Sequence, residues 1–213
     1  MVMRRASGCL FGLAFGDALG ALTEFLLFDE IRDRFPPNGL SEIIGNPARV
    51  TDDTQMTLAV GKALVEAGGS SLTAQSLEKP LIRAFVEWLQ SPDNNRAPGR
   101  TCLRACLNFK AGMTWYKATV ENSKGCGANM RVAPVGLLPL GEQLWAIAQF
   151  QAALTHGHRT ALAASDLTAY AIADLFNGGD WQGLTSRIAC LCSQPTFSLP
   201  RRLAWFSVAA SRH

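Results

Sequence analysis

The sequence predicts an all-α protein, because helical periodicity recurs along it while strand-like alternation is nearly absent. Its hydrophobic content of 48% and charged content of 17% fit a folded protein with a large core and exclude a mostly disordered chain. The 213 residues are enough for one well-buried domain. We therefore expect a single helical bundle.

The first predicted helix covers residues 6–28 and carries glycines at four-residue steps. These are Gly8, Gly12, Gly16 and Gly20. Such a stripe is expected to bring the helix backbone close to another element or a ligand. Asp17 and Glu24 lie two helical turns apart and share a face if the helix continues that far, whereas the alternative places Glu24 in a loop. Residues 35–39 then break regular structure, and the segment from there to Val50 is expected to be a loop with one extended stretch at 40–44.

The second predicted helix starts after Thr51 and ends at Gly68-Gly69, because apolar residues recur at three- and four-residue steps between them. Thr51 stands where an N-cap belongs, and Asp52 and Asp53 fall in the first turn, where the helix dipole favours carboxylates. Capping explains these residues fully. The alternative is a metal site, because residues 51–54 offer only hydroxyl and carboxylate oxygens, which magnesium prefers.

Further helices are predicted over residues 72–89, 100–110, 141–155 and 160–176, with a polar, turn-rich connection at 91–99. Between 121 and 131 the chain is polar and rich in small residues, and it turns apolar from Val132 onward. A loop of small residues that leads into a helix can hold phosphate on its backbone amides, although most glycine loops are only turns. It is not a Walker A loop, because no Gly-Lys-Ser/Thr follows.

Charge and cysteine content exclude several classes of protein. The net charge of +3 is small and the basic residues are scattered, so we expect no nucleic-acid partner. The six cysteines lack zinc-site spacing and are expected to be buried free thiols in a reducing cytoplasm. Residues 1–28 resemble a secretory signal, but Asp17 and Glu24 interrupt the apolar run, and no other stretch approaches the length of a membrane span. A cytoplasmic location is the expectation.

Four separated pieces of the chain together resemble the ADP-ribosylglycohydrolase family. They are GDALG at residues 16–20 with Glu24, TDDT at 51–54, GCGANMRVAPVG at 125–136, and LTH at 154–156. The resemblance extends from residue 5 to about residue 185. It implies a compact orthogonal helical bundle that holds two magnesium ions. It also implies hydrolysis of the glycosidic bond that joins ADP-ribose to a protein side chain or a small molecule.

The same resemblance implies roles for the acidic residues. Thr51, Asp52 and Asp53 match the first group of metal ligands, and Asp52 is also expected near the substrate. Glu24 matches an acidic residue on a mobile flap that can reach the metals and has a catalytic or gating role. Chemically, Glu24 or Asp53 could assist as general base while the anomeric carbon becomes oxocarbenium-like.

The resemblance also implies a ligand-binding loop. The residues that match the segment around the diphosphate and ribose are Gly125, Cys126, Gly127, Ala128, Asn129 and Met130. His156 matches a histidine that contacts the ligand. Many family members carry asparagine where this chain has Cys126, so the backbone role carries over here and the side-chain contact does not.

The chain departs from the family near its C-terminus. Family members complete the metal site with a later Asp-x-Asp-Thr, and this sequence has none. We therefore expect a C-terminally incomplete bundle over residues 1–190, an atypical tail over 191–213, and one magnesium ion or none. The leading hypothesis is a magnesium-dependent hydrolase that acts on an ADP-ribosylated protein or small molecule. The alternatives are an inactive ADP-ribose-binding module and a structural, crystallin-like member of the family.

Overall fold

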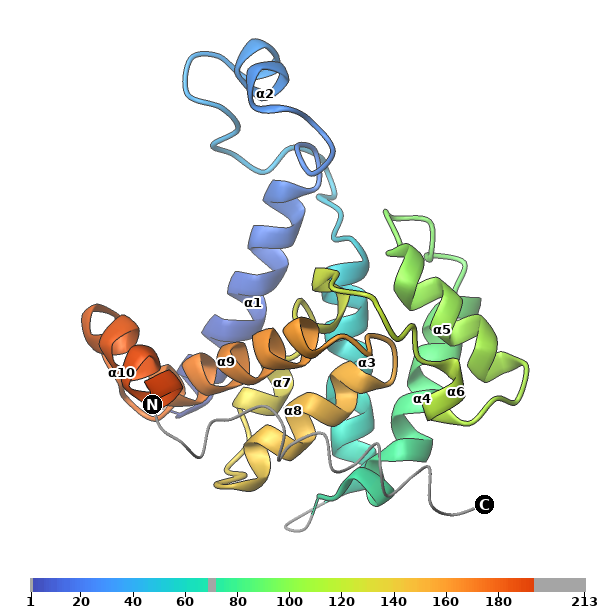
Figure 1. The fold of residues 1–213 in the computed structure, drawn as a ribbon. Coiled ribbons are helices and arrows are strands. Elements are labelled where there is room, and N and C mark those ends of the chain that lie inside the picture. The colour runs from blue at the N-terminus through green and yellow to red at the C-terminus, as the bar shows by residue number, and fades with distance from the viewer. Residues whose placement is uncertain (1, 69–71, 194–213) are drawn as a thin grey trace.

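Helices supply the regular structure of the part of the chain that the computed structural model describes, residues 2–68 and 72–193 (Figure 1). In chain order they are α1 (Val2–Gly20), α2 (Phe28–Arg34), α3 (Asp52–Ala67), α4 (Ala74–Gln90), α5 (Arg100–Lys110), α6 (Trp115–Ala118), the 3-10 helix η1 (Cys126–Ala128), α7 (Ala133–Gly136), α8 (Gln143–Ala153), α9 (Arg159–Phe176) and α10 (Trp181–Ser193). The predicted all-α class is confirmed. The loop expected up to Val50 is confirmed, and residues 40–44 form no strand, since the described residues pair only in an isolated bridge between Val120 and His156.

Helix α3 occupies the centre of the bundle, with α4 and α5 on one side and α7, α8 and α9 on the other (Figure 1). Its buried face includes Met56, Val60 and Ala63, which are inaccessible to solvent. The helix begins after the predicted N-cap Thr51 and ends before Gly68, whose φ of +57° favours glycine. Because α3 packs against α1, α4 and α7, residues at its N-terminus lie where several elements meet.

The first helix differs from its prediction in length and in packing. Helix α1 ends at Gly20, so Glu24 lies in the following turn, and the loop alternative is the correct one. A Cβ atom added at any of the four striped glycines would meet no atom of the described residues within 4 Å, so the expected approach to another element is wrong for that part of the chain, and approach to a ligand stays a prediction. The reason is that α1 turns its opposite side toward the bundle, where Ala18 is buried. Residues 21–50 form an arm that projects from the bundle, and the short helix α2 lies at the far end of this arm (Figure 1).

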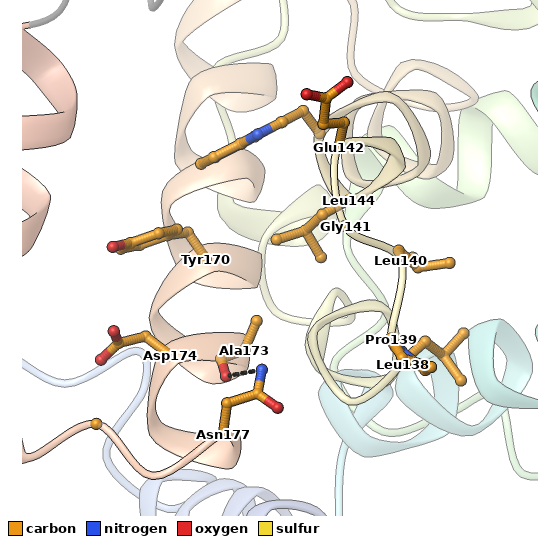
Figure 2. A pocket seen from close by; sticks show the side chains of 12 residues that line it. Leu138, Pro139, Leu140, Gly141, Glu142, Leu144, Tyr170, Ala173, Asp174 and Asn177 are labelled. Carbon is orange, nitrogen blue, oxygen red and sulfur yellow. Dashed lines mark hydrogen bonds between the residues drawn. The ribbon is translucent and has the colours of Figure 1, made fainter.

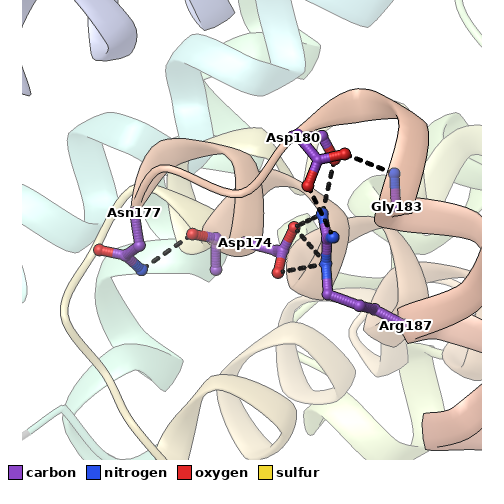
Figure 3. A network of polar contacts seen from close by, with 6 residues as sticks. Asp174, Asn177, Asp180, Gly183 and Arg187 are labelled. Atoms are coloured by element: carbon purple, nitrogen blue, oxygen red, sulfur yellow. Dashed lines mark hydrogen bonds and ion pairs between the residues drawn. The ribbon is translucent and has the colours of Figure 1, made fainter.

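Helix α10 was not predicted, and a polar network fixes it to α9 (Figure 3). Arg187 of α10 places Nη2 2.7 Å from Asp174 Oδ2 and Nη1 3.1 Å from Asp180 Oδ2. The N–H of Gly183 also donates to Asp180 over 2.6 Å. Helix α10 runs to Ser193, so most of the expected tail at 191–213 lies outside the described residues.

The cysteines follow their prediction only in part. All six are free thiols, and Cys102 and Cys106 are buried as expected. The expectation of burial is wrong for Cys126, Cys190 and Cys192, which are exposed because they lie on the surface of η1 and α10. Among the described residues, no helix has the length and apolar character that crossing a bilayer requires.

Because α7 packs closely on α9, we expect Gly136→Ala to destabilise the protein strongly. A Cβ atom at Gly136 would lie 2.7 Å from Ile172 Cβ and 2.8 Å from the carbonyl oxygen of Ala169, so the two helices would have to separate. We expect the free energy of unfolding in urea to fall by about 3 kcal/mol. Gly8→Ala is the matched control. It should raise the free energy of unfolding by about 0.5–1 kcal/mol, because alanine favours a helix more than glycine does and the described residues leave space for a Cβ atom at position 8. Equal effects of the two substitutions would contradict the packing described.

Candidate functional site

Asp17 links α1 to the start of α3. Its carboxylate accepts hydrogen bonds from the hydroxyls of Thr51 and Thr54, each over 2.6 Å, and from the backbone N–H groups of the same two residues over 2.9 and 3.1 Å. The hydroxyl proton of Thr51 is committed to Asp17, and the same oxygen accepts from the N–H of Asp53 over 3.4 Å as the N-cap of α3, so one lone pair remains for another partner. The sequence prediction did not assign Asp17 to the site. The signal that could have found it is a single acid within an apolar helix.

Asp52 and Asp53 occupy the first turn of α3 in different surroundings. Asp52 is buried, with 4% of its surface exposed, and its Oδ2 accepts from the N–H of Gly99 over 2.9 Å. Burial raises the pKa of Asp52 despite that hydrogen bond. The pKa of Asp53 is raised to about 6 by burial and by the charges of Asp52 and Asp17. The two carboxylates therefore carry unfavourable charge that a cation would relieve.

Glu24 belongs to the same acidic group, although it is exposed and lies in the turn after α1. Its pKa is raised by burial of part of its surface, and then by the charges of Asp53 and Asp17. Glu24, Asp52 and Asp53 therefore lie close enough for their charges to interact, and their joint role as metal ligands stays a prediction. The charge of Asp17 interacts with theirs as well.

The loop at 125–130 lies beside this acidic group. The pKa of the Cys126 thiol is raised by burial and then by the charge of Asp53, with smaller effects from Glu24 and Asp52. The loop also contacts α3 directly, because the Thr57 hydroxyl lies 3.2 Å from the Met130 carbonyl and 2.8 Å from the Asp53 carbonyl of its own helix, so its proton is shared between these two acceptors. Two segments that lie some 70 residues apart in the sequence therefore form one site.

The groups that this loop offers to a ligand are limited by its own hydrogen bonds. The N–H groups of Asn129 and Met130 both donate to the Cys126 carbonyl, and the buried Ala128 directs its carbonyl to Gln151. Apart from the bonds within η1 itself, no hydrogen bond of the described residues uses the N–H of Gly127 or of Ala128. Asn129 Oδ1 is buried and also lacks a partner among those residues. Contact of these residues with substrate stays a prediction.

His156 lies beneath the loop with 1% of its surface exposed. A Cβ atom at Gly127 would stand 3.0 Å from His156 Cε1 and 2.8 Å from Cys102 Sγ, and one at Gly125 would stand 3.4 Å from His156 Nε2. Glycine at position 127 is therefore required for the loop to cover the ring. Burial, together with the charge of Arg131, lowers the pKa of His156 to about 3, so the ring is neutral at pH 7.

The donor set at the entrance of α3 suits a hard cation. Carboxylate and hydroxyl oxygens without sulfur are what magnesium prefers, and the raised pKa values of Asp52 and Asp53 show that their charges lack full compensation. Within residues 2–68 and 72–193, however, no three acidic, histidine or cysteine side chains already stand together as a metal-binding group. Thr51, Asp52, Asp53 and Glu24 are the residues that would hold magnesium.

A separate cavity of about 570 Å³ lies away from these residues, between the 138–145 segment and the C-terminal half of α9 (Figure 2). Leu140, Trp145 and Tyr170 contribute to its wall, and the rings of Trp145 and Tyr170 stack with centroids 5.7 Å apart. None of the predicted site residues lines it. Cavity size therefore does not identify the site in this protein.

The raised pKa of Asp53 predicts that Asp53→Asn stabilises the metal-free protein. Above pH 6 the folded state carries a carboxylate charge that folding disfavours, and the penalty fades as the pH falls from about 6 toward the ordinary value of 3.8. After discounting for solvent screening and the lost helix-dipole interaction, we expect a gain of about 1 kcal/mol at pH 7.5. In thermal melts with a chelator, this gain should raise the melting temperature by about 2–4 °C.

The same gain should fall to about a third at pH 4.5, because the native Asp53 is then protonated while the carboxyl of the unfolded chain is still mostly ionised, and it should vanish only below the ordinary pKa of 3.8. Asp29→Asn, at an exposed position on α2, is the control and should change the melting temperature little at either pH. A gain for Asp53→Asn that grows as the pH falls would contradict this assignment.

Comparison with known proteins relates the whole arrangement to one family. The family model described as ADP-ribosylglycohydrolase matches residues 2–207. ADP-ribosyl-[dinitrogen reductase] glycohydrolase of Rhodospirillum rubrum is 33% identical over 162 residues, which cover 72% of this chain and 52% of that protein. ADP-ribosylarginine hydrolase Tri1 of Serratia proteamaculans is 26% identical over 189 residues, covering 82% of this chain and 48% of that protein. The chain thus spans about half the length of these curated relatives.

A solved structure agrees with the sequence relatives. An ADP-ribosylglycohydrolase-related protein complex superposes with a TM-score of 0.62 at 26% identity, covering 88% of this chain and 61% of that one. The residues matched by the family model, 2–207, include the acidic start of α3 and the adjoining loop. The chain belongs to the ADP-ribosylglycohydrolase family.

Proposed function

We propose that this protein is a magnesium-dependent hydrolase that releases ADP-ribose from a modified protein side chain. The observation that carries the proposal is the meeting of two chemically different groups. The acidic start of α3 adjoins the loop at 125–130, since the Thr57 hydroxyl lies 3.2 Å from the Met130 carbonyl and Asp53 raises the pKa of the Cys126 thiol. Apart from the bonds within η1, the N–H groups of Gly127 and Ala128 make no hydrogen bond among the described residues. A ribose attached to a diphosphate needs both. Relatives named for dinitrogen reductase and for arginine support a modified protein as substrate.

Some of these residues would bind the ligand, and others would take part in the hydrolysis. The N–H groups of Gly127 and Ala128 would donate to the diphosphate, and the imidazole of His156 would contact the ribose side of the ligand. Asp53 or Glu24 would take the proton of the attacking water, a role for which a carboxyl pKa raised toward neutrality is suited. Magnesium held by Thr51, Asp52, Asp53 and Glu24 would polarise the water and the ribose hydroxyls.

The test is release of ADP-ribose from an ADP-ribosylated protein, measured by chromatography with magnesium and with a chelator. We expect release that requires magnesium. Absence of release with magnesium present, for both arginine-linked and serine-linked substrates, would contradict the proposal.

A second candidate is a binding module that recognises ADP-ribose without hydrolysing it. The absence of three preassembled metal-binding side chains among the described residues favours this alternative. Calorimetric titration with ADP-ribose, combined with the release assay, separates the two. Binding without release identifies the module, and release identifies the hydrolase.

A further inference from the structure

Arg131 is a buried cation with neutral partners directly behind the ligand-binding loop. Its side chain is inaccessible to solvent, and its guanidinium stands 4.4 Å from the centroid of the Phe85 ring. Each of its five N–H groups faces a neutral acceptor. The acceptors are Gln151 Oε1 at 2.9 Å, the Gln151 carbonyl at 2.7 Å, Thr155 Oγ1 at 2.8 Å, and Met56 Sδ and Cys102 Sγ at 3.6 Å. This arginine is therefore held in a single orientation.

The contact between Arg131 and Thr155 constrains the next hydrogen bond. Arginine can only donate, so Thr155 Oγ1 accepts from it and still has one proton to give. Two acceptors are near that hydroxyl: His156 Nδ1 at 2.8 Å and the Ala152 carbonyl at 3.5 Å. The nearer acceptor is strongly favoured, because 3.5 Å is long for an O–H donor. Nδ1 of His156 thus accepts, and the one hydrogen of the neutral ring lies on Nε2.

Nε2 is also the ring nitrogen that faces the loop. It would stand 3.3–3.4 Å from Cβ atoms at Gly125 and Gly127. Within residues 2–68 and 72–193, the hydrogen bond of the His156 ring is the one at Nδ1, and none is made by Nε2. The backbone around the ring is fixed as well, since Val120 N–H donates to the Thr155 carbonyl over 3.0 Å and Gly157 N–H donates to the Val120 carbonyl over 3.0 Å.

We propose that Arg131 is a positioning residue which, through Thr155, fixes His156 as a hydrogen-bond donor at Nε2, directed at an acceptor oxygen of the ligand. The identity of that ligand rests on the proposed function, but the tautomer does not. A consequence concerns the chemistry. With a hydrogen on Nε2 and its Nδ1 lone pair engaged by Thr155, His156 has no free lone pair and cannot serve as general base. That role is left to the carboxylates.

The tautomer can be measured by nuclear magnetic resonance on protein labelled with ¹⁵N-histidine. The chain has three histidines, so His158→Asn combined with His213→Asn leaves His156 as the one imidazole. Asparagine at 158 keeps a side-chain acceptor for the N–H of Thr160. We expect Nδ1 to resonate as an unprotonated nitrogen that accepts a hydrogen bond and Nε2 as a protonated one. A ring protonated at Nδ1 at pH 7 would overturn the proposal.

Variants in this background test the relay itself. Thr155→Val removes the hydroxyl at nearly constant volume, so the Nδ1 resonance should move to that of a nitrogen without a hydrogen bond, and Thr155→Ser should restore it. Arg131→Met leaves Thr155 able to accept from the ring, so a measurable share of the Nδ1-protonated form should appear in folded protein. An unchanged tautomer and Nδ1 resonance in Thr155→Val would overturn the relay even if Arg131→Met does not fold.

Ligand binding supplies an independent readout. We expect Thr155→Val to weaken ADP-ribose binding about tenfold in calorimetry, since a poorly oriented donor loses about one hydrogen bond. In the release assay KM should rise while the pH profile of kcat stays unchanged, because His156 transfers no proton. A shifted pH profile would overturn the donor role. Absence of release by the parent protein contradicts only the proposed function, since the resonance experiment needs no substrate.

Discussion

Replacing Asp52 with asparagine is expected to lower the rate of ADP-ribose release by about 10³-fold, which corresponds to about 4 kcal/mol of transition-state stabilisation. Asparagine keeps an oxygen that can accept from the N–H of Gly99, so the start of α3 should remain folded. What it removes is the charge that would hold magnesium beside the ribose. Release of ADP-ribose at saturating magnesium measures the effect, and the far-ultraviolet circular dichroism spectrum should be unchanged.

Asp33→Asn provides the matched control for this charge removal. Asp33 lies on α2 and is exposed, at the end of the arm that projects from the bundle (Figure 1). Its substitution should leave the release rate within about twofold of the parent, since surface changes far from a site have small effects. Equal losses in the two variants would show that charge at Asp52 has no particular role.

Arg131→Met is expected to lower the free energy of unfolding by about 3 kcal/mol or more. The substitution leaves Gln151 Oε1, the Gln151 carbonyl and Thr155 Oγ1 buried without their donor, and each unsatisfied buried acceptor costs about 1–3 kcal/mol. Removing the desolvated cation offsets part of this loss. Urea unfolding followed by circular dichroism measures the change.

Two further variants distinguish this network from a general effect of losing an arginine. Arg83→Met removes an exposed ion pair with Glu66 and should cost less than about 1 kcal/mol. In the double variant Arg131→Met with Gln151→Leu, both partners become apolar. Its loss of unfolding free energy should therefore be smaller than the sum of the losses in the two single variants. Strict additivity would mean that Arg131 and Gln151 act independently.

Helix positions followed closely from the sequence where the deciding interactions are local. Helix α5 was predicted over residues 100–110 and is observed as Arg100–Lys110, and Thr51 caps α3 as its position indicated. Periodicity and capping depend on residues within four positions of one another, so a single chain contains the information. Helix α2 was missed because its seven residues include only two apolar ones, whereas α10 was missed although its 13 residues carry several apolar positions.

The site was predictable in part. Glu24, Asp52 and Asp53 were singled out by residue type and by family resemblance, and the structure brings them together. Their roles and those of residues 125–130 stay predictions. The four-glycine stripe of α1 shows the opposite case: its spacing suggested a close contact, but the face that a helix buries depends on its neighbours.

The sequence by itself determined the helical class, the acidic entrance of α3 and the composition of the loop, since these depend on the order of neighbouring residues. Only the tertiary structure decided that Asp17 reaches Thr51 and Thr54, 34 and 37 positions away, and that Arg131 reaches Thr155. The orientation of His156 follows from that second contact. Hydrogen bonds between distant residues depend on how helices pack, and packing is set by the whole core.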